Sequence, residues 1–188
     1  MIDIFLLGMA AFFAGFVDSI VGGGGLVQVP ALFSFMPGTA PATLLGTNKF
    51  AGIWGTSVAA RNYVQQVRIR WGMVVPAALM AFLFSFGGAF LVTHVSPAYL
   101  RKALPFVLVA VAIYTFKKKE FGALNKPVFS GGKEVRMAML VGAGIGFYDG
   151  FFGPGTGSFF MFLFVRIFGY DFLRASAVAK VLNVACNA

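Results

Sequence analysis

The chain is 188 residues long, with 59% hydrophobic residues, only 11% charged residues and a formal net charge of +9. Soluble domains are about 45–50% apolar and about 25% charged, so an ordinary water-soluble protein is excluded; a single cysteine also excludes a disulfide scaffold. The basic residues lie between long apolar runs and not along one face, which argues against nucleic acid as a partner. We therefore predict an all-α, multi-pass membrane protein, with one transmembrane domain over residues 1–188 and the lipid bilayer as its surroundings.

The first apolar stretch, Ile4–Met36, is longer than the about 20 residues that one membrane-spanning helix needs. Four consecutive glycines, Gly22–Gly25, interrupt it, and glycine has poor helix propensity. The pattern predicts a hairpin of two helices, Ile4–Val21 and Leu26–Met36. Asp3 stands where a secretory signal would carry a basic residue, so we interpret the stretch as mature sequence.

Three further spans follow, at Ala42–Ala60, Trp71–Val92 and Tyr99–Phe116. Basic residues cluster after the first and the third of them: Arg61, Arg68, Arg70, Lys117, Lys118, Lys119, Lys126, Lys133 and Arg136. Cytoplasmic loops of membrane proteins are enriched in Lys and Arg, so we expect loop 117–136 in the cytoplasm and the N-terminus outside.

An internal repeat relates the two halves of the chain by a shift of 131 residues. The shift takes Gly15-Phe16-Val17-Asp18 to Gly146-Phe147-Tyr148-Asp149, and Lys49 to Lys180. Internal repeats of this kind are typical of secondary transporters. We assign repeat one to residues 4–116, the cytoplasmic loop to 117–136 and a partial repeat two to 137–188.

The two repeats are expected to face opposite ways across the membrane. Three full spans, an odd number, separate the first hairpin from the second, which we place at about Met137–Phe168. Arg166 and Arg174 then lie on the cytoplasmic side, as the distribution of positive charge requires, whereas a parallel repeat with four spans places them outside. Repeat two has no counterpart of Trp71–Phe116, so we expect a C-terminally truncated chain, either a fragment of a protein of about 247 residues or a natural truncation.

Four ionisable residues lie within apolar stretches: Asp18, Lys49, Asp149 and Lys180. Each costs about 2.5–3.5 kcal/mol at a helix centre on insertion scales, so each needs a partner or a wet cavity. We expect Lys49 and Lys180 to bind an anion, and Asp18 and Asp149 to orient the lysines or carry protons. The alternative is two structural Asp–Lys pairs that only neutralise one another.

The two glycine-rich breaks are expected to supply hydrogen-bond donors to the same anion. Each break starts a new half-helix, whose N-terminus carries about +0.5 charge and free N–H groups. The candidate donors are Gly22, Gly23, Gly24, Gly25, Gly153, Gly155, Thr156 and Gly157, with Asn48 beside them. Other polar residues expected along the path are Gln28, Thr47 and Asn183. Close helix packing is the alternative, and it explains Gly146-x-x-x-Gly150 better than four consecutive glycines.

No catalytic, nucleotide or metal motif is present in the sequence. There is no phosphate-cradling Gly-x-x-x-x-Gly-Lys-Ser/Thr run and no cluster of His, Cys and carboxylates suited to catalysis. We therefore expect neither an enzyme nor a bound cofactor or metal.

The paired motifs resemble the sulfite exporter TauE/SafE family of bacterial inner-membrane permeases. The first is Gly15-Phe16-Val17-Asp18 with Gly22–Gly25 and Gly46-Thr47-Asn48-Lys49; the second runs from Gly146 to Gly157 and continues at Ala177-Val178-Ala179-Lys180. The resemblance covers nearly the whole chain and implies transport of small sulfur-containing anions, such as sulfite or sulfonates, without nucleotide hydrolysis. Members of the family usually have about twice four membrane segments.

Three functions remain open on the sequence. The first is a secondary transporter of small anions by alternating access, in which the repeats rock around a midplane site. The second is a non-transporting membrane subunit or anchor, and the third is an anion channel. A homo-oligomer is compatible with each of them.

Overall fold

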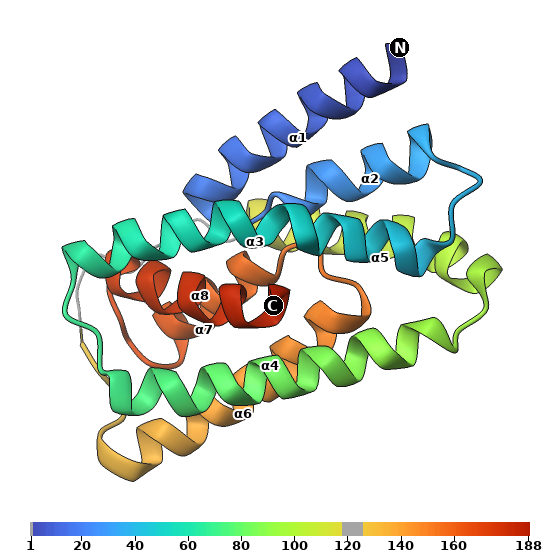
Figure 1. The fold of residues 1–188 in the computed structure, drawn as a ribbon. Coiled ribbons are helices and arrows are strands. Elements are labelled where there is room, and N and C mark those ends of the chain that lie inside the picture. Colours follow the sequence, from blue (N-terminus) through green and yellow to red (C-terminus); the bar gives the residue numbers. More distant parts are fainter. Residues whose placement is uncertain (1, 118–125) are drawn as a thin grey trace.

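A computed structural model describes residues 2–117 and 126–188, and within these ranges the chain is all-helical, as predicted. The helices are α1 Ile2–Val21, α2 Gly25–Phe35, α3 Pro41–Gln66, α4 Trp71–Thr93, α5 Pro97–Lys117, α6 Gly131–Phe151, α7 Thr156–Arg166 and α8 Phe172–Asn187 (Figure 1). Residues 118–125 of the expected cytoplasmic loop, with Lys118 and Lys119, lie outside the described ranges. α6 begins at Gly131 rather than at the expected Met137.

Two broken hairpins, α1–α2 and α6–α7, form at the glycine-rich segments. Gly22 has φ +75° where α1 ends, and Gly153 has φ +89° after α6; L-residues with a side chain rarely adopt such angles. The short second arms, α2 and α7, are both 11 residues long, and each bound of α7 lies 131 positions after the corresponding bound of α2. That the two hairpins are inverted copies stays a prediction.

Local signals explain where the helices after the hairpins begin. Pro41 is the first residue of α3, a position where proline's missing N–H and fixed φ are tolerated. Asp171 caps α8 by accepting a hydrogen bond from the backbone N–H of Arg174 at 2.8 Å. These starts place Lys49 in the third turn of α3 in one half, and Lys180 at the corresponding position of α8 in the other.

α4 and α6 pack at backbone contact along three helical turns. Three α6 glycines, four residues apart, each lie against the backbone of a small α4 residue: Gly142 on Ala77, Gly146 on Ala81 and Gly150 on Ser85. A Cβ on Gly146 would lie 2.4 Å from the Ala81 carbonyl oxygen. Small residues that let helix backbones approach are typical of interfaces between membrane helices. The close-packing interpretation of Gly146-x-x-x-Gly150 agrees with this contact.

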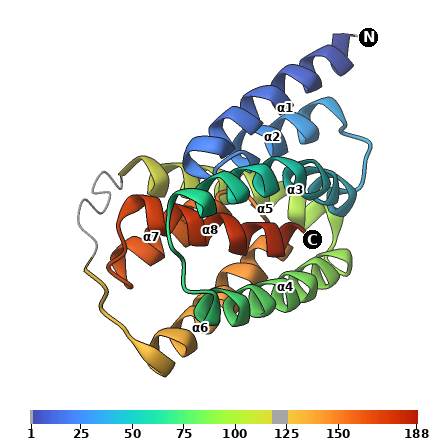
Figure 2. The ribbon, with the colours of Figure 1, turned by 60° about the vertical axis from the view of Figure 1, so that its left-hand side comes forward.

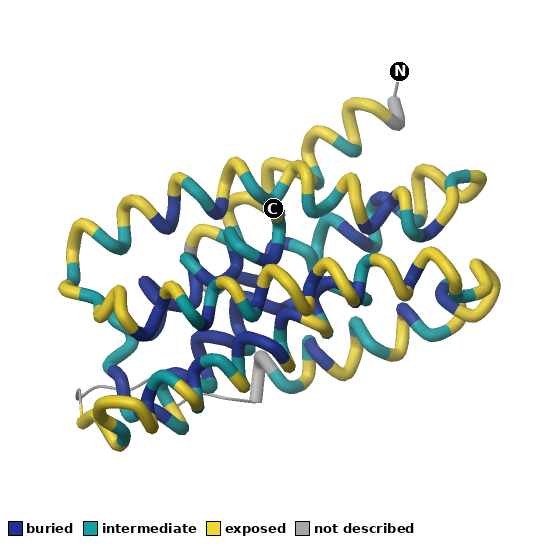
Figure 3. Tube along the Cα trace, turned by 60° about the horizontal axis from the view of Figure 1, so that its bottom comes forward, coloured by how far each residue is buried: buried dark blue, intermediate teal, exposed yellow. Residues whose placement is uncertain are grey.

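The surface is apolar, and the buried residues concentrate at the centre of the bundle (Figure 3). α7 and α8 lie inside, between α3 and α4 (Figure 2), and are largely buried. By contrast Phe12 on α1, Phe86 on α4 and Phe106 on α5 are exposed by 70%, 69% and 77%. Among the described residues two helices, Trp71–Thr93 and Pro97–Tyr114, are long and apolar enough to cross a membrane. Such a surface fits a lipid environment.

The connecting segments lie at the two ends of the bundle. At one end residues 67–70, 126–134 and 167–174 meet; the backbone N–H of Lys126 donates to Gly169 O at 2.8 Å, and Arg70 Nη1 donates to Glu134 at 2.7 Å. At the other end Arg101 donates to the carbonyl of Pro37 at 2.7 Å. Which end faces the cytoplasm stays a prediction.

Tyr170 at the first of these ends gives a pH-dependent contribution to stability. Its hydroxyl donates to buried Glu134 at 2.5 Å, and burial, with the neighbouring Glu134 carboxylate, raises the pKa of the phenol. A group whose pKa is higher in the folded than in the unfolded protein contributes its full stabilisation at any pH below the unfolded-state pKa, which is about 10 for tyrosine. That contribution is lost as the pH rises from there toward the folded-state pKa.

We expect the thermal midpoint of the detergent-purified protein to fall as the pH rises above about 10. Tyr170→Phe should lower the midpoint at neutral pH, because Glu134 loses a donor, and should make the alkaline fall shallower. Tyr99→Phe, at an exposed tyrosine, should keep the original slope. An unchanged slope in Tyr170→Phe would contradict the assignment.

Candidate functional site

The two helix breaks meet at the centre of the molecule. A Cβ on Gly22 would lie 2.9 Å from backbone carbons of Gly157, and a Cβ on Gly157 would lie 2.6 Å from the carbonyl oxygen of Gly22. Gly25 similarly approaches Pro154. The N-termini of α2 and α7 are therefore brought together, although the two breaks are more than a hundred residues apart in the sequence.

Two ion pairs join the halves of the chain crosswise. Lys49 of α3 pairs with Asp149 of α6, while Lys180 of α8 pairs with Asp18 of α1 at 3.0 Å. Each lysine thus contacts the aspartate of the other half, not of its own. The two pairs occupy positions that the 131-residue shift interchanges.

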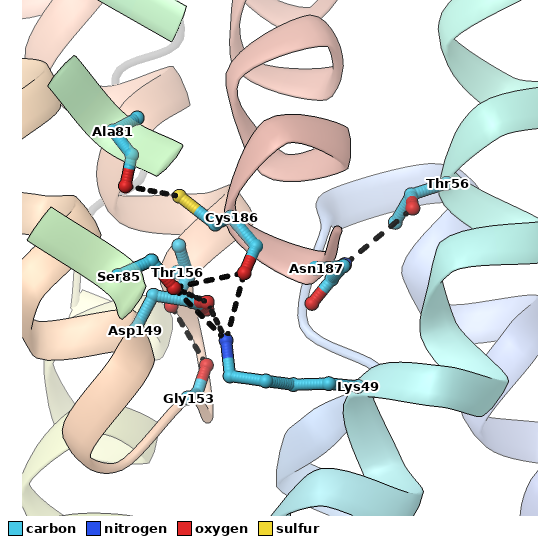
Figure 4. Close-up of polar contacts among 9 residues, drawn as sticks. All are labelled: Lys49, Thr56, Ala81, Ser85, Asp149, Gly153, Thr156, Cys186 and Asn187. Atoms are coloured by element: carbon cyan, nitrogen blue, oxygen red, sulfur yellow. Dashed lines mark hydrogen bonds and ion pairs between the residues drawn. The ribbon is translucent and has the colours of Figure 1, made fainter. Parts of the chain in front are cut away.

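Polar groups of α4 and α8 complete the surroundings of Lys49 (Figure 4). Lys49 Nζ donates to Ser85 Oγ at 3.4 Å and to the Cys186 carbonyl at 3.1 Å, and Ser85 Oγ donates to the same carbonyl at 2.8 Å. The Asp149 side chain is 4% exposed. A buried charge of this kind is tolerated when it is paired and hydrogen-bonded.

The second ion pair, between Lys180 and Asp18, has fewer described hydrogen-bond partners than the first. Lys180 Nζ donates to both the carboxylate and the backbone carbonyl of Asp18, and its side chain is 5% exposed. Asp18 also accepts a hydrogen bond from the Gly24 N–H at 3.3 Å, within the break itself. The carboxylate therefore connects the lysine of one half to the helix break of the other.

A cavity of about 190 Å³ lies between the breaks. Both aspartates border it, with the glycines of the two breaks and with amide and hydroxyl side chains: Gln28, Asn48, Thr56, Thr156, Asn183 and Asn187. One water needs about 10–15 Å³ of such volume, so there is room for a small hydrated ion. Amide N–H₂ groups, hydroxyls and two helix N-termini are donors suited to an oxygen-rich anion.

Most of the sequence-predicted site residues border this cavity. They are Asp18, Gly22, Gly24, Gly25, Asn48, Asp149, Gly153, Gly155, Thr156 and Gly157. Gly23, Lys49 and Lys180 are not among the lining residues; the lysines stand behind the aspartates that hold them. Gln28 and Asn183 line the cavity as expected, whereas Thr47 is exposed and donates to the Thr43 carbonyl.

Sequence reasoning missed Ser85, Thr56 and Asn187. Asn187 Nδ2 donates to Thr56 Oγ1 at 3.5 Å across the cavity wall. The shift of 131 residues interchanges these two positions, so a search for polar residues in register would have found them. Ser85 carries no such signal. Among the described residues no group of three His, Cys, Asp or Glu side chains is placed to hold a metal ion.

Comparison with known proteins identifies the family. The family model described as sulfite exporter TauE/SafE matches residues 7–188. The chain belongs to this family. No solved structure matches it.

Relatives within the TauE/SafE family are named as membrane transporters. The chain is 40% identical over 179 residues to the probable membrane transporter protein ORF9 of Sinorhizobium sp, a match that covers 95% of this chain and 67% of that protein. It is 35% identical over 190 residues to the probable membrane transporter protein YfcA of Escherichia coli K12, which covers 100% and 69%. A probable membrane transporter protein of Haemophilus influenzae is 34% identical, with 97% and 70% covered. The chain is thus similar to membrane transporters along nearly all of its length.

Proposed function

We propose that the chain is a secondary transporter of small oxyanions, of the sulfite or organosulfonate class, that works by alternating access. The family and the names of the relatives support the transporter, and the family description supports the sulfur oxyanion. The observation that carries the proposal is structural: a polar cavity lies between the two helix breaks at the centre of the bundle, and the aspartates of two crossed ion pairs border it.

The alternating movement would use an inverted repeat. The matching bounds of α2 and α7 and the three helices between the hairpins support this arrangement. The crossed ion pairs and the contact of Gly22 with Gly157 are where the two halves touch at the cavity. Rocking of one half against the other at this contact opens the cavity to alternate sides in transporters built from inverted repeats.

The charge of the site suggests how an anion and a proton are coupled. Two lysines and two aspartates sum to zero, and the carboxylates, not the ammonium groups, face the cavity. An entering anion therefore meets like charge. Protonation of Asp18 or Asp149 removes the repulsion and releases Lys180 or Lys49 toward the anion, so anion and proton binding favour each other.

In this mechanism each predicted site residue has a defined role. Lys49 and Lys180 bind the anion once they are released, and Asp18 and Asp149 hold the lysines and carry the proton. The two breaks present N–H donors at the N-termini of α2 and α7, with Asn48 beside them. The N–H groups of Gly22, Gly24 and Gly153 are not among these donors, because they already donate to Asp18 and Tyr148.

Membrane orientation follows from the charge at the two ends of the bundle. We place the protein in a bacterial inner membrane with its N-terminus outside, because the described residues at the end formed by 67–70, 126–134 and 167–174 are rich in Lys and Arg. Ser130→Cys and Ser96→Cys test this, since both serines are exposed and the native Cys186 is buried. An impermeant maleimide added to whole cells should label position 96 and not position 130; the reverse pattern inverts the topology.

Transport by the protein in liposomes tests the proposed function. We expect saturable sulfite flux driven by a proton gradient, and a decrease of at least about tenfold in Lys49→Ala, because a charge-assisted contact with the anion is lost. Lys133→Ala, at a lysine placed over the Phe129 ring, is the control and should transport normally. Undiminished flux in Lys49→Ala rules out the role of Lys49. Flux that never saturates favours a channel, and no flux in any protein favours an anchor or subunit.

A further inference from the structure

A second cavity, of about 230 Å³, lies at the Lys- and Arg-rich end of the bundle. It is formed where α4 begins and α8 follows the turn after α7 (Figure 1, left-hand end). Its polar lining consists of Arg68, Arg70, Tyr170 and Arg174, and its apolar lining of Ile69, Met73 and Val178. None of these residues borders the cavity between the helix breaks.

The carboxylates near this second cavity are already engaged. Glu134 accepts from Arg70 Nη1 at 2.7 Å and from the Tyr170 hydroxyl at 2.5 Å. Asp171 accepts from the backbone N–H of Arg174 and caps α8. Among the described residues neither Arg68 nor Arg174 has a carboxylate within ion-pair distance. Three guanidinium groups thus line the cavity while only one is neutralised.

One donor of Arg174, a residue that lines the cavity, is both buried and unsatisfied. Arg174 Nε is shielded from solvent and has no hydrogen-bond partner among the described residues. The guanidinium lies over the Tyr170 ring, with its carbon 5.8 Å from the ring centroid. A buried donor without a partner costs free energy, so the Arg174 guanidinium is not fully satisfied by the protein itself.

We infer that this second cavity binds a phosphate-type oxyanion held by Arg68 and Arg174. The planar guanidinium presents several donors in a fixed geometry that matches phosphate oxygens, and such charge-assisted contacts are strong. Arg70 also lines the cavity, but its charge is paired with Glu134.

Two sources supply this chemistry, free phosphate and the phosphate group of an anionic lipid. Trp71, which follows the lining residue Arg70 in the sequence, is an exposed tryptophan in the first turn of α4, and tryptophan is enriched where membrane meets water. Basic pockets between helices at this level bind lipid headgroups. A cavity at the end of the bundle is also open to dissolved phosphate.

Binding of inorganic phosphate and of lipid to the purified protein distinguishes the sources. The first measurement is the thermal midpoint in neutral detergent with rising phosphate, compared with chloride at equal ionic strength. The second is lipid retained in native mass spectrometry after reconstitution in phosphatidylglycerol or in phosphatidylcholine. The variants are Arg174→Gln and Arg68→Gln; no described ion pair or hydrogen bond involves the Arg68 side chain, so its removal should leave the fold intact. The control is Arg136→Gln, at an exposed residue of α6.

We expect phosphate, phosphatidylglycerol or both to bind the parent protein and Arg136→Gln, and to bind the two cavity variants at least about tenfold more weakly. Binding of phosphate alone identifies a dissolved oxyanion as the ligand, and selective retention of phosphatidylglycerol identifies a lipid. The inference is overturned if the parent protein responds to neither ligand, or if Arg68→Gln and Arg136→Gln lose binding equally.

Discussion

Replacing Lys180 by methionine should abolish anion transport and destabilise the protein, because Asp18 would then keep its charge without a partner. Breaking one side of a buried ion pair costs about 3–5 kcal/mol, and we expect the lower end because the Asp18 side chain is 20% exposed. Denaturant unfolding in detergent and proton-driven sulfite flux in liposomes measure the two effects.

The charge-neutral double variant separates the two roles of the pair. Asp18→Asn with Lys180→Met leaves no unpaired charge, so most of the lost stability should return, whereas transport should stay absent because both proposed ligand-handling groups are gone. If the double variant transports at the parent rate, the pair is only structural. The proposal for Lys180 then fails, although the fold and the family remain.

A mismatched double variant tests the crossed arrangement itself. Asp18→Asn with Lys49→Met combines residues from the same half of the chain and removes one member of each observed pair. Asp149 and Lys180 then both lose their partners, so this variant should be less stable than either matched double variant. A mismatched variant as stable as the matched one would contradict the crossed pairs.

The sequence predicts the four charges of the site, but it does not predict how they pair. Asp18, Lys49, Asp149 and Lys180 stand out because an ionisable residue in an apolar stretch needs a partner. The repeat places one acid and one base in each half, which makes pairing within a half the simplest expectation. Pairing across the halves depends on how two hairpins meet in space, and no local pattern carries that information.

The same limit applies to the cavity. Its glycines were predictable, because consecutive glycines and Gly-Pro-Gly interrupt a helix wherever they lie. The position of the lysines behind the aspartates was not predictable, since it depends on the directions of side chains from α3 and α8. Ser85 was not predictable either, because a single serine in a membrane helix is ordinary until α4 and α6 come into contact.

The close contact of α4 with α6 makes Gly146→Ala the second change with a large expected effect. The new Cβ would lie 2.4 Å from the Ala81 carbonyl oxygen and 2.8 Å from the Ala81 Cα. Overpacking usually costs about 1–3 kcal/mol. We expect about 3 kcal/mol or more here, because backbone atoms on both sides leave no side chain that can turn away. The free energy of unfolding in detergent measures the loss.

Gly146→Ala should also disturb the Lys49–Asp149 ion pair, because Ser85 lies one helical turn beyond Ala81 on α4 and contacts Lys49. If α4 moved away from α6, the Ser85 hydroxyl would lose its hydrogen bonds with Lys49 and with the Cys186 carbonyl. Transport should therefore fall in Gly146→Ala beyond what the lost folded fraction explains.

Gly144→Ala is the matched control on the same helix. Nothing lies within 4 Å of a Cβ at Gly144, and alanine favours a helix more than glycine does, so stability should stay the same or rise slightly. If Gly146→Ala and Gly144→Ala are equally stable, α4 and α6 are farther apart than the structure has them. Ser85 would then not be held against Lys49 and Asp149, and the surroundings of that ion pair would differ from those described above.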